Sequence, residues 1–168
     1  MVMGTPRLSG SEPVAGEQVY QRALALLTRR DHSAAELERK LSARGFTPEA
    51  IGEVLGRLTG QGFIDDRRFA GRFTESSLRS GRYVGKRLIL ELQRRGISRQ
   101  IADEAVAEAS AEQGESRVLA ALLAKRFSSF DPSTASLQEQ RRVFAYLQRK
   151  GFSIAAIRGG LSGVDEDE

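Results

Sequence analysis

The sequence predicts an all-α fold made of three tandem three-helix repeats in an elongated, curved arrangement. One pattern occurs three times: two apolar residues four positions apart, one or more basic residues, a glycine, an apolar residue and Ser or Thr. The glycines of the three copies are Gly45, Gly96 and Gly151. A period of about 50 residues accommodates three short helices, and similar helical units in line form a curved chain rather than a ball. No convincing stretch shows the apolar–polar alternation of a β-strand.

Each copy of the pattern predicts where one helix ends and the next begins. Glycine readily adopts the left-handed backbone found just after a helix C-terminus. With Gly96 at that position, Leu92 and Ile97 form the apolar contact of a Schellman motif. The Ser or Thr that follows stands where an N-cap opens the next helix.

The first repeat is predicted over residues 17–65, after a disordered leader over residues 1–16 that is interrupted by glycine and proline. An apolar stripe from Val19 to Leu27 predicts its first helix. The second helix opens with a capping box at Ser33, and the third opens at Thr47 and Pro48. Three glycines either weaken this third helix or permit a close helix contact, and the sequence leaves both interpretations open for Gly52, Gly56 and Gly60.

The second repeat is predicted over residues 66–111, and Asp65 or Asp66 is expected to cap its first helix. Phe63 and Ile64, just before it, are expected to form an apolar plug between repeats. The third repeat is predicted over residues 112–162 and is followed by an acidic tail over residues 163–168.

The charge of the chain is concentrated in one segment. The formal net charge is only +4, but residues 66–100 carry ten bases and three acids. Residues 17–65 carry seven of each, residues 101–158 carry eight bases and seven acids, and the last four residues are all acidic. A focused basic surface predicts a polyanionic partner such as nucleic acid, or an acidic protein groove.

Several classes of site are excluded by residue types. The chain has no cysteine and a single histidine, His32, so the sequence predicts no disulfide and no metal site. The Gly85-Lys86 pair lacks the glycine spacing and preceding strand of a phosphate-binding P-loop, and capping explains the two junction aspartates better than acid–base chemistry does. We therefore expect a protein that is not an enzyme and binds no cofactor. With no long apolar run and no signal-peptide pattern, we expect a cytoplasmic monomer.

The candidate binding residues belong to the basic middle repeat. Several arginines near glycine-freed backbone suit phosphate contact, which would be salt-sensitive and tolerant of sequence. The alternative is an ordinary solvated helix face, because arginine is common on surfaces. The residues expected to contact DNA phosphate or an acidic protein surface are Arg72, Arg79, Arg82, Lys86, Arg87 and Arg94.

The sequence resembles the RecX family, the bacterial proteins that modulate the RecA recombinase. The resemblance covers about residues 17–160 and is carried by four motifs. They are Ser33-x-x-Glu36-Leu37-x-x-Lys40-Leu41, Gly62-Phe63-Ile64-Asp65-Asp66-x-x-Phe69-Ala70, Arg79-x-Gly81-x-x-x-Gly85, and Leu88-x-x-Glu91-Leu92-x-x-Arg95-Gly96-Ile97.

The resemblance implies tandem three-helix repeats that lie in the groove of a RecA filament on single-stranded DNA. Such binding would inhibit ATP turnover, strand exchange and coprotease activity, or promote filament disassembly. Two other functions remain open from the sequence. A helix-turn-helix protein would prefer one duplex sequence, whereas a protein-binding scaffold would bind independently of salt and DNA.

Overall fold

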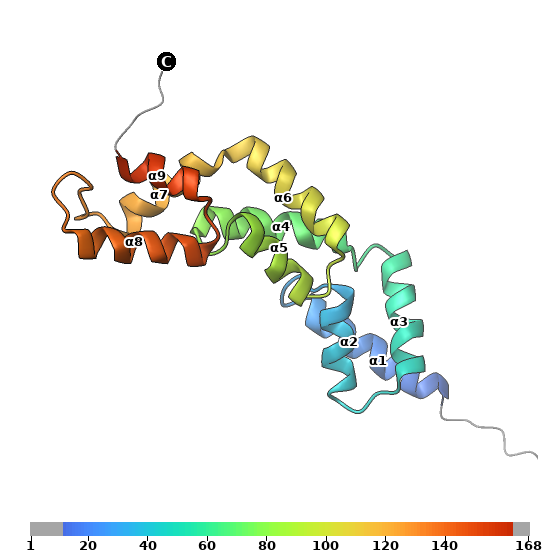
Figure 1. Cartoon of the computed structure of the whole chain (residues 1–168). Coiled ribbons are helices and arrows are strands. Elements are labelled where there is room, and N and C mark those ends of the chain that lie inside the picture. Colours follow the sequence, from blue (N-terminus) through green and yellow to red (C-terminus); the bar gives the residue numbers. More distant parts are fainter. Residues whose placement is uncertain (1–11, 163–168) are drawn as a thin grey trace, which may run out of the picture. The chain divides into compact units, whose positions relative to one another are not determined.

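The structure is a computed structural model that describes residues 12–162, with side chains from residue 16 onward. Within this range the chain forms nine α-helices and no β-strand (Figure 1), which confirms the all-α prediction. The contacts divide the chain into two compact units, with the boundary after Asp66. The elongated, curved arrangement of the repeats stays a prediction.

The first unit contains the three helices of the first repeat. They are α1 (Glu12–Leu27), α2 (Ala34–Ser42) and α3 (Pro48–Gly60), each of which packs against the other two. Their shared core consists of Val19, Ala23, Leu37, Leu41, Ile51, Val54, Leu58 and Ile64. Ile64 therefore belongs to this core, whereas Phe63 is half exposed, so only one of the two expected plug residues is buried.

Helix α1 begins earlier than the sequence analysis placed it. Residues 12–16, which were expected in the leader, are helical, and the rest of the leader lies outside the described residues. Pro13 falls in the first turn, where the missing N–H removes no helical hydrogen bond. Pro13 is therefore compatible with the helix start, although proline contributed to the prediction of a disordered leader.

The predicted N-caps of the first repeat are present. The side chain of Ser33 accepts a hydrogen bond from the N–H of Glu36, and Thr47 does the same for Ala50 with Pro48 in the first turn. Asp66 also contributes at the start of α2, where its Oδ1 accepts the N–H of Ala34 at 3.0 Å.

The glycines of α3 are not used for close packing. A Cβ atom added to any of the three would meet no other atom within 4 Å apart from its own helix. Of the two interpretations that the sequence left open for Gly52, Gly56 and Gly60, the structure supports the weakened helix.

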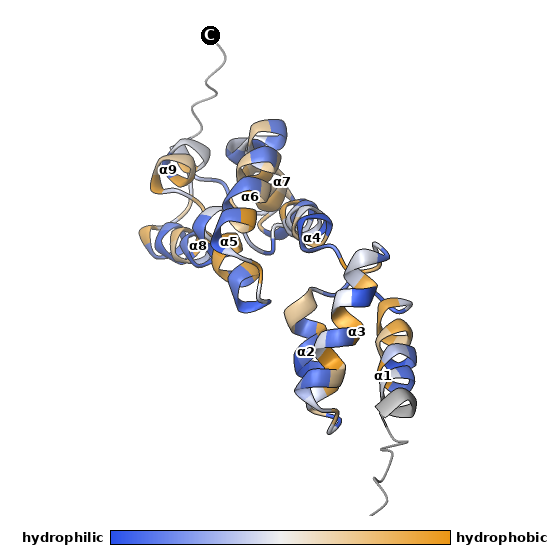
Figure 2. Ribbon diagram, turned by 90° about the vertical axis from the view of Figure 1, so that its right-hand side faces the viewer, coloured by the Kyte–Doolittle hydropathy of each residue, from blue (hydrophilic) through white to orange (hydrophobic). Residues whose placement is uncertain are grey.

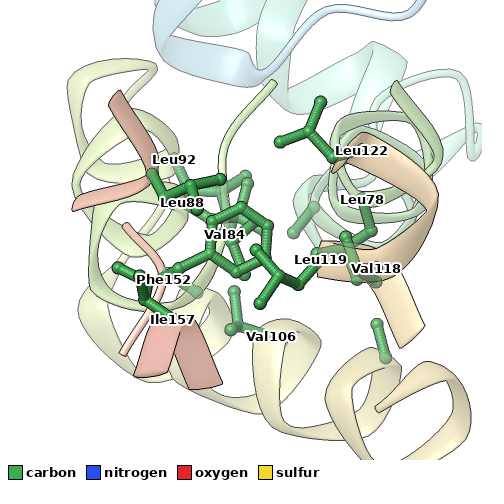
Figure 3. Packing of buried hydrophobic residues seen from close by; sticks show 14 of the residues in the cluster. Leu78, Val84, Leu88, Leu92, Val106, Val118, Leu119, Leu122, Phe152 and Ile157 are labelled. Atoms are coloured by element: carbon green, nitrogen blue, oxygen red, sulfur yellow. The ribbon is translucent and has the colours of Figure 1, made fainter. Parts of the chain in front are cut away.

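The second unit contains six helices with one continuous core. They are α4 (Asp66–Ser80), whose first residue falls in the first unit, α5 (Gly85–Arg94), α6 (Arg99–Gln113), α7 (Glu115–Arg126), α8 (Leu137–Lys150) and α9 (Ile154–Ser162). Figure 3 shows core side chains of both repeats pointing toward one another, Val84 and Leu88 beside Phe152 and Ile157. The second and third repeats therefore share their core. Polar residues cover the outer faces of the helices (Figure 2).

The repeated cap pattern forms as predicted. Gly45, Gly96 and Gly151 have φ values of 84°, 85° and 104°, in the left-handed region. The N–H of Ile97 donates to the carbonyl of Leu92 at 3.1 Å, and Gly96 donates to the carbonyl of Gln93 at 2.8 Å, the two hydrogen bonds of a Schellman motif. The same pair of bonds closes α8 at Gly151.

A complete capping box stands at the start of α8. Ser136 accepts the N–H of Glu139, and the Glu139 carboxylate accepts the N–H of Ser136 at 3.0 Å. The hydroxyl of Ser136 also donates to the Glu139 carboxylate at 2.9 Å, and this bond, together with the one from the Ser136 N–H, lowers the pKa of Glu139 below its ordinary value.

Candidate nucleic-acid interface

The six basic residues proposed from the sequence lie on α4, on α5 and on the turn between them. Arg72 and Arg79 are exposed on α4, Arg82 is exposed in the turn, and the other three are on α5. Of those three, Lys86 and Arg94 are exposed and Arg87 is half-buried.

The turn between α4 and α5 is held by the third repeat. Gly81 has φ 61°, and a Cβ atom on it would lie 2.7 Å from Cδ1 of Leu122 on α7. The N–H of Val84 donates to the carbonyl of Lys150 at 2.9 Å. Our interpretation that the glycines free this backbone to approach phosphate is therefore wrong for Gly81, because that glycine allows the turn to pack on α7. These contacts hold the turn in place, and with it the positions of Arg82 and Lys86 at its surface.

Two of the predicted cations share one aromatic ring. The guanidinium carbons of Arg82 and Arg87 lie 5.3 Å and 5.9 Å from the ring centroid of Tyr83. Tyr83 stacks on Phe73 with 6.5 Å between ring centroids, and Phe73 in turn carries Arg95 at 4.4 Å. Cations over aromatic faces are held in place while their outer N–H groups stay available to a ligand.

A buried carboxylate organises the arginines of α5. Glu91 is only 6% exposed, and its carboxylate lies 2.8 Å from Nη2 of Arg87, 2.9 Å from Nη1 of Arg94 and 3.6 Å from Nη1 of Arg95. We call these four residues the Glu91 cluster. One carboxylate facing three guanidinium groups leaves a net charge of +2 in the cluster.

The Glu91 cluster changes the expected roles of two predicted residues. Arg87 and Arg94 were expected to contact a ligand directly, but each is also an ion-pair partner of Glu91. Arg94 keeps 62% of its side chain exposed, whereas Arg87 keeps 37%. Such oriented guanidinium groups suit bidentate contact with phosphate oxygens, because the carboxylate has already fixed their geometry. The neighbouring Leu90 is 49% exposed.

Sequence reasoning missed Glu91, Arg95 and Tyr83 as parts of this surface. Glu91 stands four positions after Arg87, three before Arg94 and four before Arg95, so all of them share one side of the helix. That spacing is visible in the sequence and could have identified the cluster. The contacts of Tyr83 depend on how the turn folds and have no comparable local signal.

Among the described residues, no group of three His, Cys, Asp or Glu side chains is placed to hold a metal ion. None of the helices between residues 12 and 162 has the length and apolar character that crossing a bilayer requires.

Replacing Glu91 by glutamine should lower the free energy of unfolding of the second unit by about 1–3 kcal/mol, because charge-assisted hydrogen bonds of a buried carboxylate are lost. The partial exposure of its arginine partners keeps the loss at the lower end of that range. Urea denaturation would measure this loss. Glu75→Gln, an exposed site on α4, makes the same charge change and should stay within about 0.5 kcal/mol of the unchanged protein. Equal stability of the two variants would contradict a structural role for Glu91.

Comparison with known protein families matches each repeat separately. The model for the first three-helix domain of RecX matches residues 20–58, that for the second matches residues 65–106, and that for the third matches residues 115–159. Together these matches cover most of the chain.

Whole-chain comparisons agree with the domain matches. The regulatory protein RecX of Trichlorobacter lovleyi is 36% identical over 139 residues, which is 83% of this chain and 90% of that protein. The RecX of Halorhodospira halophila is 34% identical over 155 residues, covering 92% of both. The crystal structure of RecX from Lactobacillus salivarius matches with a TM-score of 0.71 at 24% identity, over 89% of this chain and 96% of that one. At that identity the crystal structure supports the fold alone.

Proposed function

Because this chain belongs to the RecX family of regulatory proteins, we propose that it is a negative regulator of the RecA recombinase. In this role it binds in the groove of the filament that RecA forms on single-stranded DNA. Contacts to DNA phosphates and to neighbouring RecA subunits hold the filament in one state. ATP turnover, strand exchange and coprotease activity are then inhibited in the cytoplasm.

The observation that carries this proposal is the family match together with the basic surface of α4 and α5. Arg79 at the end of α4, Arg82 in the turn and Lys86 at the start of α5 are exposed, and the third repeat holds this turn in place. The Glu91 cluster adds oriented guanidinium groups on the next helix. A filament that holds the phosphate backbone of single-stranded DNA is a partner of complementary charge.

The direct test is the effect of the purified chain on RecA. We expect increasing amounts to inhibit the ATPase activity of RecA on single-stranded DNA and to block strand exchange in the same concentration range. Inhibition that requires nearly equal amounts of the two proteins indicates groove filling, whereas inhibition at a small fraction indicates capping of filament ends. RecA that retains full ATPase and strand-exchange activity at a several-fold excess of this protein would overturn the proposal.

A further inference from the structure

The first unit contains a hollow that the charge totals of the sequence conceal. Its volume is about 280 Å³, and it is lined by Arg30, Glu36, Arg39, Lys40, Ala43 and Arg44. Four of the seven bases between residues 17 and 65 thus face one hollow with a single acid among them. The balance of seven bases and seven acids had led us to treat this repeat as neutral.

The one acid in the hollow is already engaged. Glu36 lies 2.9 Å from Nη1 of Arg30, and only 11% of its side chain is exposed. The formal charges of the lining residues sum to +3. Arg44 also donates to the carbonyl of Lys40 at 2.8 Å, which places a guanidinium over the partly negative C-terminal end of α2.

We propose that this hollow is an anion-binding site that takes a backbone phosphate of single-stranded nucleic acid. Its cations come from the loop before α2, from the last turn of α2 and from the residues after that helix, so N–H donors of three segments line one hollow and are available to the oxygens of an oxyanion. An acidic protein partner fits less well. Among the described residues that line the hollow, Ala43 is the only apolar one, and protein interfaces depend on larger apolar or aromatic anchors.

The inference rests on the proposed function in one respect: it takes the single-stranded DNA of the RecA filament as the natural ligand. The binding itself is measured with DNA alone. A failed phosphate site would therefore leave inhibition of RecA untouched, and a failed inhibition would leave the phosphate site untouched.

The only histidine of the sequence lies beside the hollow, so its pKa can be used to detect a bound anion. His32 is 4% exposed, and its Nδ1 lies 3.0 Å from the carbonyl of Arg30. Burial lowers the pKa of His32, and the charges of Arg30 and Lys40 lower it further, while the hydrogen bond to the Arg30 carbonyl and the charge of Glu36 raise it. A phosphate bound in the hollow adds negative charge nearby, so the pKa of His32 should rise when the site is filled.

The experiment uses the full chain and an oligothymidine as the probe. Lys40→Gln together with Arg44→Gln should weaken binding on the order of tenfold at moderate salt. The plot of log affinity against log salt concentration should become shallower by about 0.7, because that is the contribution of one phosphate contact on a single strand. Arg22→Gln with Arg117→Gln removes the same charge from exposed positions outside the hollow and should leave the slope nearly unchanged.

Nuclear magnetic resonance of His32 provides the second measurement. In the unchanged protein, oligothymidine and inorganic phosphate should both raise the pKa of His32, and the Lys40/Arg44 variant should lose this response. The site is disproved if the pKa of His32 in the unchanged protein does not move, a result that needs no variant to fold. If a glutamate-rich peptide raised the pKa of His32 at lower concentration than oligothymidine does, the ligand of the hollow would be an acidic protein and not nucleic acid. That result would also overturn the proposal.

Discussion

Replacing Arg82 and Lys86 together by glutamate should abolish inhibition of the RecA ATPase. Both side chains are exposed on the turn and first residues of α5, and neither belongs to the Glu91 cluster. The double change alters the net charge by −4 and places two carboxylates where phosphates or acidic side chains would lie. Lost attraction and new repulsion together should weaken filament binding on the order of a hundredfold or more.

The structure separates this pair from Arg87, which the sequence had grouped with it. Changing Arg87 to glutamate would also put a second acid beside buried Glu91, so lost inhibition would mix a folding defect with a binding defect. The double variant of Arg82 and Lys86 avoids that ambiguity, and circular dichroism should show unchanged helicity.

A matched control distinguishes a local surface from net charge. Arg117 on α7 and Arg158 on α9 are exposed in the same unit, and their replacement by glutamate makes the same change of −4. We expect this control to inhibit RecA nearly as well as the unchanged protein. Equal loss of inhibition in the two variants would mean that overall charge, and not the α4–α5 turn, drives filament binding.

The helices of this protein were predictable because their ends are encoded locally. A Schellman motif needs a left-handed residue, and glycine adopts that conformation without steric cost, so Gly96 predicts the end of α5 within a few residues of sequence. The same holds for Ser136, whose bond to Glu139 spans three residues. Such signals require no knowledge of tertiary contacts.

The shared core of the second and third repeats was not predictable in the same way. The N–H of Val84 donates to the carbonyl of Lys150, and Gly81 packs on Leu122. The partners in each contact are tens of residues apart, and no local sequence pattern predicts either contact. We had therefore assigned the turn glycines to backbone freedom, whereas Gly81 serves helix packing.

The candidate sites were predictable only in part, because net charge along a segment does not describe its distribution in space. In the middle repeat the excess of bases was large enough to indicate a basic surface. In the first repeat, folding brings Arg30, Lys40 and Arg44 to one hollow, and equal numbers of acids elsewhere cancel the bases in the total. Only folding reveals that hollow.

Replacing Gly151 by alanine should destabilise the second unit far more than replacing Gly45 by alanine destabilises the first. Both glycines end a second helix of a repeat with a left-handed backbone, so both variants lose about 1–2 kcal/mol from that conformation alone. At Gly45 an added Cβ meets nothing within 4 Å. At Gly151 it would collide with the carbonyl oxygen of Val84 and lie 2.7 Å from Cβ of Arg87.

The collision at Gly151 cannot be relieved by a side-chain rotation, because the carbonyl is main chain. The start of α5 must move away from the end of α8, which weakens the hydrogen bond from Val84 to Lys150 and opens the shared core. Overpacking of this kind adds about 1–3 kcal/mol, so the total loss should reach about 2–5 kcal/mol.

Hydrogen exchange measured residue by residue can test this difference, because it reports on the two units separately. In the Gly151 variant the amide of Val84 and the core of α5 and α8 should exchange much faster, while α1 to α3 keep their protection. In the Gly45 variant the loss of protection from hydrogen exchange should be modest and confined to the first unit. Equal destabilisation by the two substitutions would show that the second and third repeats do not depend on the contact between α5 and α8. Other contacts would then have to hold the turn between α4 and α5, and with it Arg82 and Lys86, in place.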